Sequence, residues 1–217
     1  MNRSLAALAL FAAAATSQAD GLQSLERFAR EVKSGQAAFT QVVTAPSREG
    51  AAPRSKASSG QFSFSRPGRF RFDYLKPFAQ TLVADGQTLW IHDPDLNQVT
   101  ARSQAAALGQ TPAALIASAA DLNALRRTFA LQALDDADGL QWVQATPLSA
   151  EAQVRRIRVG FRRGADAAQL PLLSVLEIDD SFGQRSVMRF EGFLPNGVVP
   201  VNRFEFTPPA GADVLGQ

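Results

Sequence analysis

The chain of 217 residues carries 22 Lys and Arg against 20 Asp and Glu, 46% hydrophobic residues, one His and no Cys. At this length a single domain can bury a sizeable core without disulfides or metal. The near-neutral charge excludes the clustered basic surface of a nucleic-acid-binding protein. The absence of Cys excludes a disulfide framework, a thiolate metal site, a Cys nucleophile and a lipid anchor on Cys.

Residues 1–19 have the pattern of a secretory signal peptide. The start is positively charged at Arg3, an apolar run follows over 5–15, and Ser17-Gln18-Ala19 is a small-x-small cleavage site. The apolar run is shorter than the roughly 20 residues that a transmembrane helix needs. We therefore expect cleavage after Ala19, a mature domain over 20–217, and export to a bacterial periplasm.

The first predicted element of the mature chain is an amphipathic helix. Leu22, Leu25, Ala29 and Val32 recur at helical spacing, and Ser34-Gly35 is a stop signal. A strand candidate follows over 38–44. Residues 46–60 are rich in Gly, Pro, Ser and charge, which predicts a loop or long turn.

Short strand patterns follow the loop. Alternation and β-propensity predict strands over 61–65, 69–75, 80–84, 88–92 and 97–100. Asp85-Gly86 is a hairpin turn signal between two of them. Thr111-Pro112 then predicts the start of a helix, and Asp121 the cap of a second short helical turn.

Strands resume in the second half of the chain. They are predicted over 128–134, 140–146, 154–162, 172–179, 185–193 and 202–207. With about eleven strands and two or three short helices, the expected fold is mainly β. We expect one highly curved antiparallel sheet, or an unclosed barrel, because long meanders twist toward closure. The helices would cover its concave face.

Arg66 breaks the apolar pattern of its strand. Phe62 and Phe64 share one face, and the same parity continues to Arg66. Either a change at Pro67-Gly68 or a position at the rim leaves the guanidinium in water, or Arg66 is buried and needs acceptors. Backbone carbonyls at helix ends are suitable acceptors, so a buried Arg66 would hold a helical lid over the sheet.

Motifs for catalysis and metal binding are weak in this sequence. Nucleophile-elbow, phosphate-loop and HExxH patterns are absent. The run that begins at Asp93 lacks the Gly and Glu of a calcium loop. His92 and Asp93 point to opposite faces of a strand, and the pairs 135–136 and 179–180 are typical of turn carboxylates. The fifteen Phe suit either a packed core or a cavity for acyl chains.

Five motifs occur in order along the mature chain: RPGRFRFDYLKP, LVADGQTLWIHDPDLNQV, TPAALI, DSFGQ and FEFTPPAGADV. Together they resemble the periplasmic outer-membrane lipoprotein carrier family, the A component of the Lol system. The resemblance implies an unclosed barrel with a helical lid over a hydrophobic cavity. It also implies triacylated lipoproteins as cargo, an inner-membrane ABC transporter as donor, and an outer-membrane lipoprotein receptor as acceptor.

The resemblance also implies roles for particular residues. Arg66 would be the lid latch, bonded to the backbone carbonyls of Ala29, Ile116 and Ala117. The residues implied to line the acyl cavity are Leu25, Phe62, Phe64, Phe70, Phe72, Leu115 and Ile116. No cofactor, no metal, no nucleic acid and no catalytic residue are expected, and the carrier would be a monomer. The long 46–60 loop departs from the family pattern.

Three alternatives remain at this point. A carrier with the same fold could take a glycolipid or another envelope lipid, and only a bound ligand would distinguish it. The receptor of the same system is a membrane-anchored lipoprotein, which the absence of Cys argues against. An envelope lipid esterase is disfavoured because the sequence has no nucleophile motif.

Overall fold

A computed structural model describes residues 21–47, 52–105, 116, 122–164 and 168–216. Within these residues, twelve strands form one sheet in the order β12-β6-β5-β4-β3-β2-β1-β11-β10-β9-β8-β7. All pairings are antiparallel except that of β12 with β6. The two edge strands β12 and β7 do not pair with each other, so the barrel is unclosed, as the sequence predicts.

The first half of the sheet is a meander of strands joined by short connections. Its elements are α1 (Gly21–Glu31), β1 (Ser34–Thr44), β2 (Ser55–Ser65), β3 (Arg69–Lys76), β4 (Gln80–Ala84), β5 (Thr88–Asp93) and β6 (Gln98–Ser103). The second half contains α4 (Leu122–Arg126), β7 (Phe129–Ala133), β8 (Leu140–Pro147), β9 (Val154–Arg162), β10 (Leu172–Asp180), β11 (Arg185–Pro195), η1 (Val201–Phe204) and β12 (Asp213–Gly216).

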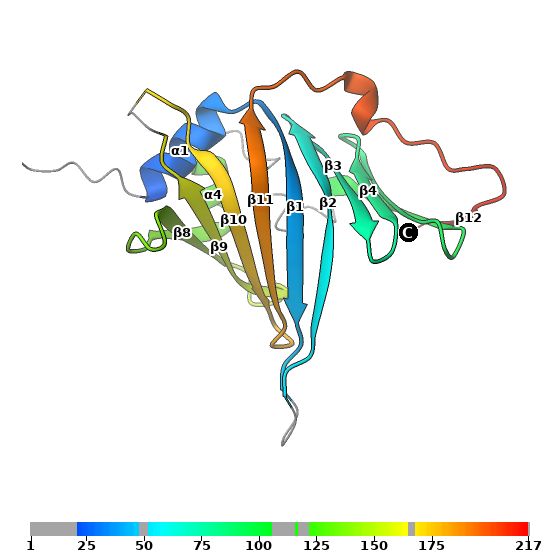
Figure 1. Cartoon of the computed structure of the whole chain (residues 1–217), viewed down its shortest axis with the longest axis horizontal. Helices are drawn as coiled ribbons and strands as arrows, with labels where there is room; N and C mark the ends of the chain where they lie inside the picture. The colour runs from blue at the N-terminus through cyan, green and yellow to red at the C-terminus, as the bar shows by residue number, and fades with distance from the viewer. Residues whose placement is uncertain (1–20, 48–51, 106–115, 117–121, 165–167, 217) are drawn as a thin grey trace, which may run out of the picture.

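The sheet curves strongly, and α1 and α4 lie against one half of it (Figure 1). Helix α1 packs on β7, β8 and β9, and α4 packs on β7. The buried face of α1 is formed by Leu25, Phe28 and Ala29, at the spacing that the sequence predicts. Gly21 lets the helix begin in direct contact with β8, because a Cβ there would overlap the Trp142 carbonyl.

Aromatic residues dominate the core between α1 and the sheet. The Phe28 ring lies 5.3 Å from Phe161 and 6.0 Å from both Phe64 and Phe193, measured between centroids. Burial of one such side chain contributes about 1.5–3 kcal/mol to folding. The concave face is therefore an apolar surface that α1 covers.

Two sequence predictions are wrong near the first hairpin and the C-terminus. Residues 55–60 belong to β2, although 46–60 was expected to be a loop, because they pair with β1 in register from Ser55 opposite Thr44. Their side chains are polar on both faces, so they give no alternation signal. Residues 201–204 are a 3-10 helix and 205–207 are not strand, although a strand was expected over 202–207.

The C-terminal segment crosses to the far edge of the sheet along its convex side, where β12 adds to β6 (Figure 1). Phe204 is 2% exposed, and Phe206 lies 5.6 Å from Trp90 between ring centroids. Arg203 and Arg71 both bind the Asp73 carboxylate. Arg71 is therefore half-buried under this segment, and the segment also covers Trp90 through Phe206.

The predicted helix after Thr111-Pro112 falls almost entirely outside the described residues. Ile116 is helical, and α4 takes the place of the short helical turn predicted after Asp121. Within the described ranges, none of the helices has the length and apolar character required to cross a membrane.

Removal of the Phe204 ring should release the C-terminal segment from the convex face. We expect Phe204→Ala to lower the free energy of unfolding by about 3–5 kcal/mol, as for other buried aromatic residues. Denaturant unfolding followed by circular dichroism measures this. Val201→Ala is the matched control, since Val201 is 64% exposed in the same 3-10 helix. Equal, small losses in both variants would contradict this packing.

Candidate functional site: the lid contact and the concave face

Arg66 lies in the turn after β2, and this turn lies beside the C-terminal end of α1. Its Nε donates a hydrogen bond of 2.9 Å to the Val32 carbonyl, and its backbone N–H donates one of 2.8 Å to the Lys33 carbonyl. The guanidinium carbon lies 5.6 Å from the centre of the Phe28 ring and 5.5 Å from that of Phe64. A half-buried cation thus joins α1 to the aromatic face of the sheet.

Burial changes the ionisation of Arg66 only moderately. The loss of water around the guanidinium lowers the pKa of Arg66 to about 10, so the side chain stays charged at neutral pH. The acceptor of its Nε bond, Val32, is three residues after the expected Ala29. Bonds to the carbonyls of Ala29 and Ile116 stay predictions, and Ala117 lies outside the described residues.

A second contact at the end of α1 was not predicted from the sequence. The Asn196 side chain accepts a bond of 2.7 Å from the Lys33 N–H and donates one of 3.0 Å to the Glu31 carbonyl. Asn196 has a φ of 57°, which Asn tolerates better than most residues. The contact of Asn196 depends on β11 ending beside α1, which no local sequence pattern shows.

The turn that carries Arg66 is held from its other side by Gln104, which is 3% exposed. Gln104 Nε2 donates a bond of 2.7 Å to the Gly68 carbonyl, and its Oε1 accepts one of 2.9 Å from the Gly86 N–H. The Asp85-Gly86 hairpin is confirmed by the pairing of β4 with β5. Burial opposes ionisation of Asp85, but hydrogen bonds from Thr88, Trp90 and Gln87 outweigh it and keep the pKa of Asp85 low.

The residues expected to line an acyl cavity are packed on one another. Leu25, Phe62, Phe64, Phe70, Phe72 and Ile116 are all buried in one cluster, and Leu115 lies outside the described residues. The Phe62 ring stacks on the rings of Phe72 and Phe64, with centroid distances of 4.5 Å and 5.8 Å. In this closed arrangement they form the core, and their contact with acyl chains stays a prediction.

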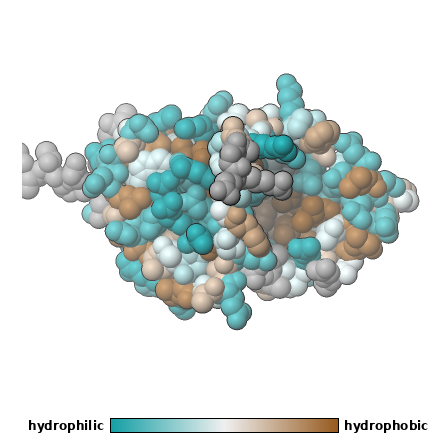
Figure 2. All heavy atoms as spheres, turned by 90° about the horizontal axis from the view of Figure 1, so that it is seen from below, coloured by the Kyte–Doolittle hydropathy of each residue, from teal (hydrophilic) through white to brown (hydrophobic). Residues whose placement is uncertain are grey.

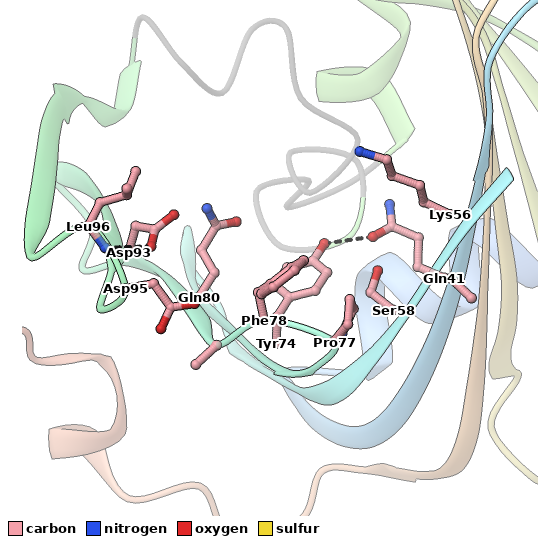
Figure 3. A pocket seen from close by; sticks show the side chains of 12 residues that line it. Gln41, Lys56, Ser58, Tyr74, Pro77, Phe78, Gln80, Asp93, Asp95 and Leu96 are labelled. Atoms are coloured by element: carbon pink, nitrogen blue, oxygen red, sulfur yellow. Dashed lines mark hydrogen bonds between the residues drawn. The ribbon is translucent and has the colours of Figure 1, made fainter. Parts of the chain in front are cut away.

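An open pocket of about 790 Å³ lies farther along the concave face, at the end away from α1. Figure 2 shows this end of the molecule hollowed, with hydrophobic surface inside the hollow. The lining residues come from β1 to β5 and from their connections, and include Gln41, Lys56, Tyr74, Phe78 and Asp93 (Figure 3). The Tyr74 ring packs against the Phe39 ring, with 5.0 Å between their centroids, so the pocket borders the aromatic core.

His92 and the carboxylates at 179 and 180 have contacts within the fold. His92 lies on the convex side, 5.7 Å from the Phe206 ring, whereas Asp93 lines the pocket on the concave side. Asp179 pairs with Arg156. Asp180 accepts bonds of 2.9 and 2.8 Å from the backbone N–H groups of the turn that follows it. The turn and the ion pair thus hold the Asp179 and Asp180 carboxylates.

Comparisons with known proteins agree with this architecture. Residues 30–207 match the family model described as outer membrane lipoprotein carrier protein LolA. A protein of Albidiferax ferrireducens named outer-membrane lipoprotein carrier protein is 58% identical, over 98% of both chains. One of Methylibium petroleiphilum with the same name is 52% identical, over 98% of this chain and 97% of that protein.

A solved structure supports the fold independently. An uncharacterized conserved protein from Thermus thermophilus superposes with a TM-score of 0.53 at 12% identity, over 91% of this chain and 97% of that one. The fold is thus an unclosed sheet with an apolar concave face that α1 partly covers. Together with the family match and the identities, this shows that the chain belongs to the outer membrane lipoprotein carrier protein LolA family.

The environment of Tyr74 can be tested directly, because it is the only Tyr in the chain. Burial raises the pKa of Tyr74 to about 12. The phenolate absorbance of the native protein should therefore appear near pH 12, and that of the unfolded protein near the model-peptide value of about 10. The contribution of the Tyr74 hydroxyl to the free energy of unfolding is complete below its pKa in the unfolded chain. This contribution is lost as the pH rises through its pKa in the folded protein.

Spectrophotometric titration of native and denatured protein measures both values, and Tyr74→Phe provides the blank. Native ionisation at the unfolded pKa would show that the hydroxyl is in water, and would contradict the burial of Tyr74.

Proposed function

We propose that the mature chain is a periplasmic carrier that takes triacylated lipoproteins from an inner-membrane ABC transporter and delivers them to an outer-membrane receptor. The observation that carries this proposal is the aromatic concave face covered by α1, in a chain 58% identical to a named lipoprotein carrier. The interpretation of residues 1–19 as a cleaved signal peptide belongs to the same proposal and supports the periplasmic location.

The physical requirement for such a carrier follows from the acyl chains. Burial of one CH₂ group is worth about 0.8 kcal/mol, so a chain of about 15 methylenes resists leaving a membrane by about 12 kcal/mol. Three chains cannot cross water unaided. A soluble carrier must therefore offer a comparable apolar surface, and the Phe-lined concave face of β1, β2 and β3 supplies it.

Reversible binding requires a competitor for the same surface. In the closed structure α1 provides one, since Phe28 occupies the space between Phe64, Phe161 and Phe193. The Arg66 bond to Val32 forms when α1 closes, so it offsets part of the energy gained by cargo binding. The lid latch would thus promote release. The proposal includes no cofactor and no catalytic step, and the energy for loading comes from the donor.

Release of labelled lipoproteins from spheroplasts tests the carrier function. The purified mature protein is incubated with spheroplasts that hold radiolabelled lipoproteins, and the supernatant is analysed. Soluble one-to-one complexes with triacylated lipoproteins are expected. If no lipoprotein is released and mass spectrometry finds a different lipid in the protein, the cargo is another envelope lipid and the proposal is wrong.

Arg66→Leu tests the latch. The variant should load cargo but transfer it to the receptor at least about tenfold more slowly, because a bond to a charged group worth about 1.5–3 kcal/mol no longer favours the closed state. A transfer assay with receptor-containing membranes measures the rate. Arg189→Leu is the control, since Arg189 is exposed on β11. Normal transfer by Arg66→Leu would refute the latch.

A further inference from the structure

On each of five neighbouring strands, a polar inward-facing side chain lies beyond the apolar ones, toward the end away from α1. On β1 and β3, for example, Phe39 is followed on the same face by Gln41, and Phe72 by Tyr74. These side chains form a polar row, one residue from each of β1 to β5: Gln41, Ser58, Tyr74, Gln80 and Asp93. All five line the pocket of about 790 Å³, a volume typical of small-ligand sites.

A hydrogen-bonded chain lies at the boundary between the polar row and the core. The Tyr74 hydroxyl donates a bond of 2.9 Å to Gln41 Oε1 (Figure 3). Gln41 Nε2 in turn donates one of 2.8 Å to the Ser186 hydroxyl. Below the hydroxyl, the Tyr74 ring packs on Phe39 and Phe72. A Phe would pack equally well there, so the hydroxyl adds a polar group that ring packing does not require.

The chemistry of the row suits a neutral polar group attached to an apolar chain. Burial of an amide without hydrogen bonds costs about 2–7 kcal/mol, so the polar group of such a ligand is favoured where hydrogen-bond donors and acceptors exist. The Gln41 amide has two N–H groups, of which one binds Ser186, and the Tyr74 oxygen can also accept. The charged residues at the pocket have both signs, Lys56 against Asp93 and Asp95, which gives no preference for an anionic head group.

We propose that the polar row binds the glyceryl esters and the N-terminal amide of the acylated cysteine of a lipoprotein, while the acyl chains extend along the aromatic face toward α1. This inference rests on the proposed carrier function and assigns the orientation of the cargo. The protein part of the cargo then leaves through the open end of the pocket, between the β3–β4 and β5–β6 connections. Phe78 and Leu96, 72% and 69% exposed, stand at that opening.

Two probes separate recognition of the polar group from binding of the chains. The first is a synthetic tripalmitoylated cysteinyl peptide, and the second is diphenylhexatriene, a hydrocarbon without polar groups. We expect Tyr74→Phe and Gln41→Leu each to weaken lipopeptide binding by about three- to tenfold, the usual effect of one hydrogen bond. Binding of the hydrocarbon should not change. Gln61→Leu, on the exposed outer face of β2, is the matched control and should bind both probes normally.

The outcomes distinguish this inference from the carrier function. If the wild type binds the lipopeptide and both variants bind it equally well, the polar row has no role and the inference is wrong. Equal losses for lipopeptide and hydrocarbon would show a general packing defect and would also overturn it. If the wild type binds neither probe, the carrier function itself fails.

Photo-cross-linking tests the orientation without any substitution. A diazirine is placed on the residue that follows the acylated cysteine of the same lipopeptide, and cross-linked peptides are identified by mass spectrometry. Cross-links should fall at the opening of the pocket, around Lys56, Phe78 and Leu96. Cross-links confined to α1, β8 and β9 would place the polar group at the opposite end and contradict the inference.

Discussion

The fold depends on keeping one face of a strongly curved, unclosed sheet away from water. That face carries the Phe side chains of β1, β2, β3 and β11, and the sheet has no second sheet to cover it within the described part of the chain. In the closed structure α1 covers one half through Leu25 and Phe28. A surface that must always be covered, either by the protein's own helix or by a ligand of similar character, is the physical basis of a carrier that both binds and releases.

Polar contacts from two distant parts of the chain hold the end of α1 in the closed position. Arg66 binds the Val32 carbonyl from the β2–β3 turn, and Asn196 binds the backbone at Glu31 and Lys33 from the end of β11. Gln104 fixes the Arg66 turn to the Asp85-Gly86 hairpin between β4 and β5. These are polar contacts, individually modest and directional, beside an aromatic interface. They add to the closed state without filling the space that acyl chains would need.

The alternation of apolar and polar residues predicted the strands well where a strand has one apolar face, as for 185–193 in β11. It failed over 55–60, where both faces are polar and only pairing with β1 defines the strand. It also failed over 202–207, where two alternating Phe pack onto the convex face from a 3-10 helix and an extended segment. Contacts such as that of Asn196 with α1, and the polar row across five strands, depend on the register between distant segments, which no local pattern contains.

Hydrogen–deuterium exchange of α1, with and without bound lipopeptide, is the most direct test of whether helix and cargo compete for the concave face. We expect the amides of α1 to exchange faster when the lipopeptide is bound, because the helix leaves Phe64 and Phe161, while those of β1 and β11 stay protected. Unchanged or slower exchange of α1 in a protein saturated with lipopeptide would contradict this competition, since cargo and helix would then occupy different surfaces.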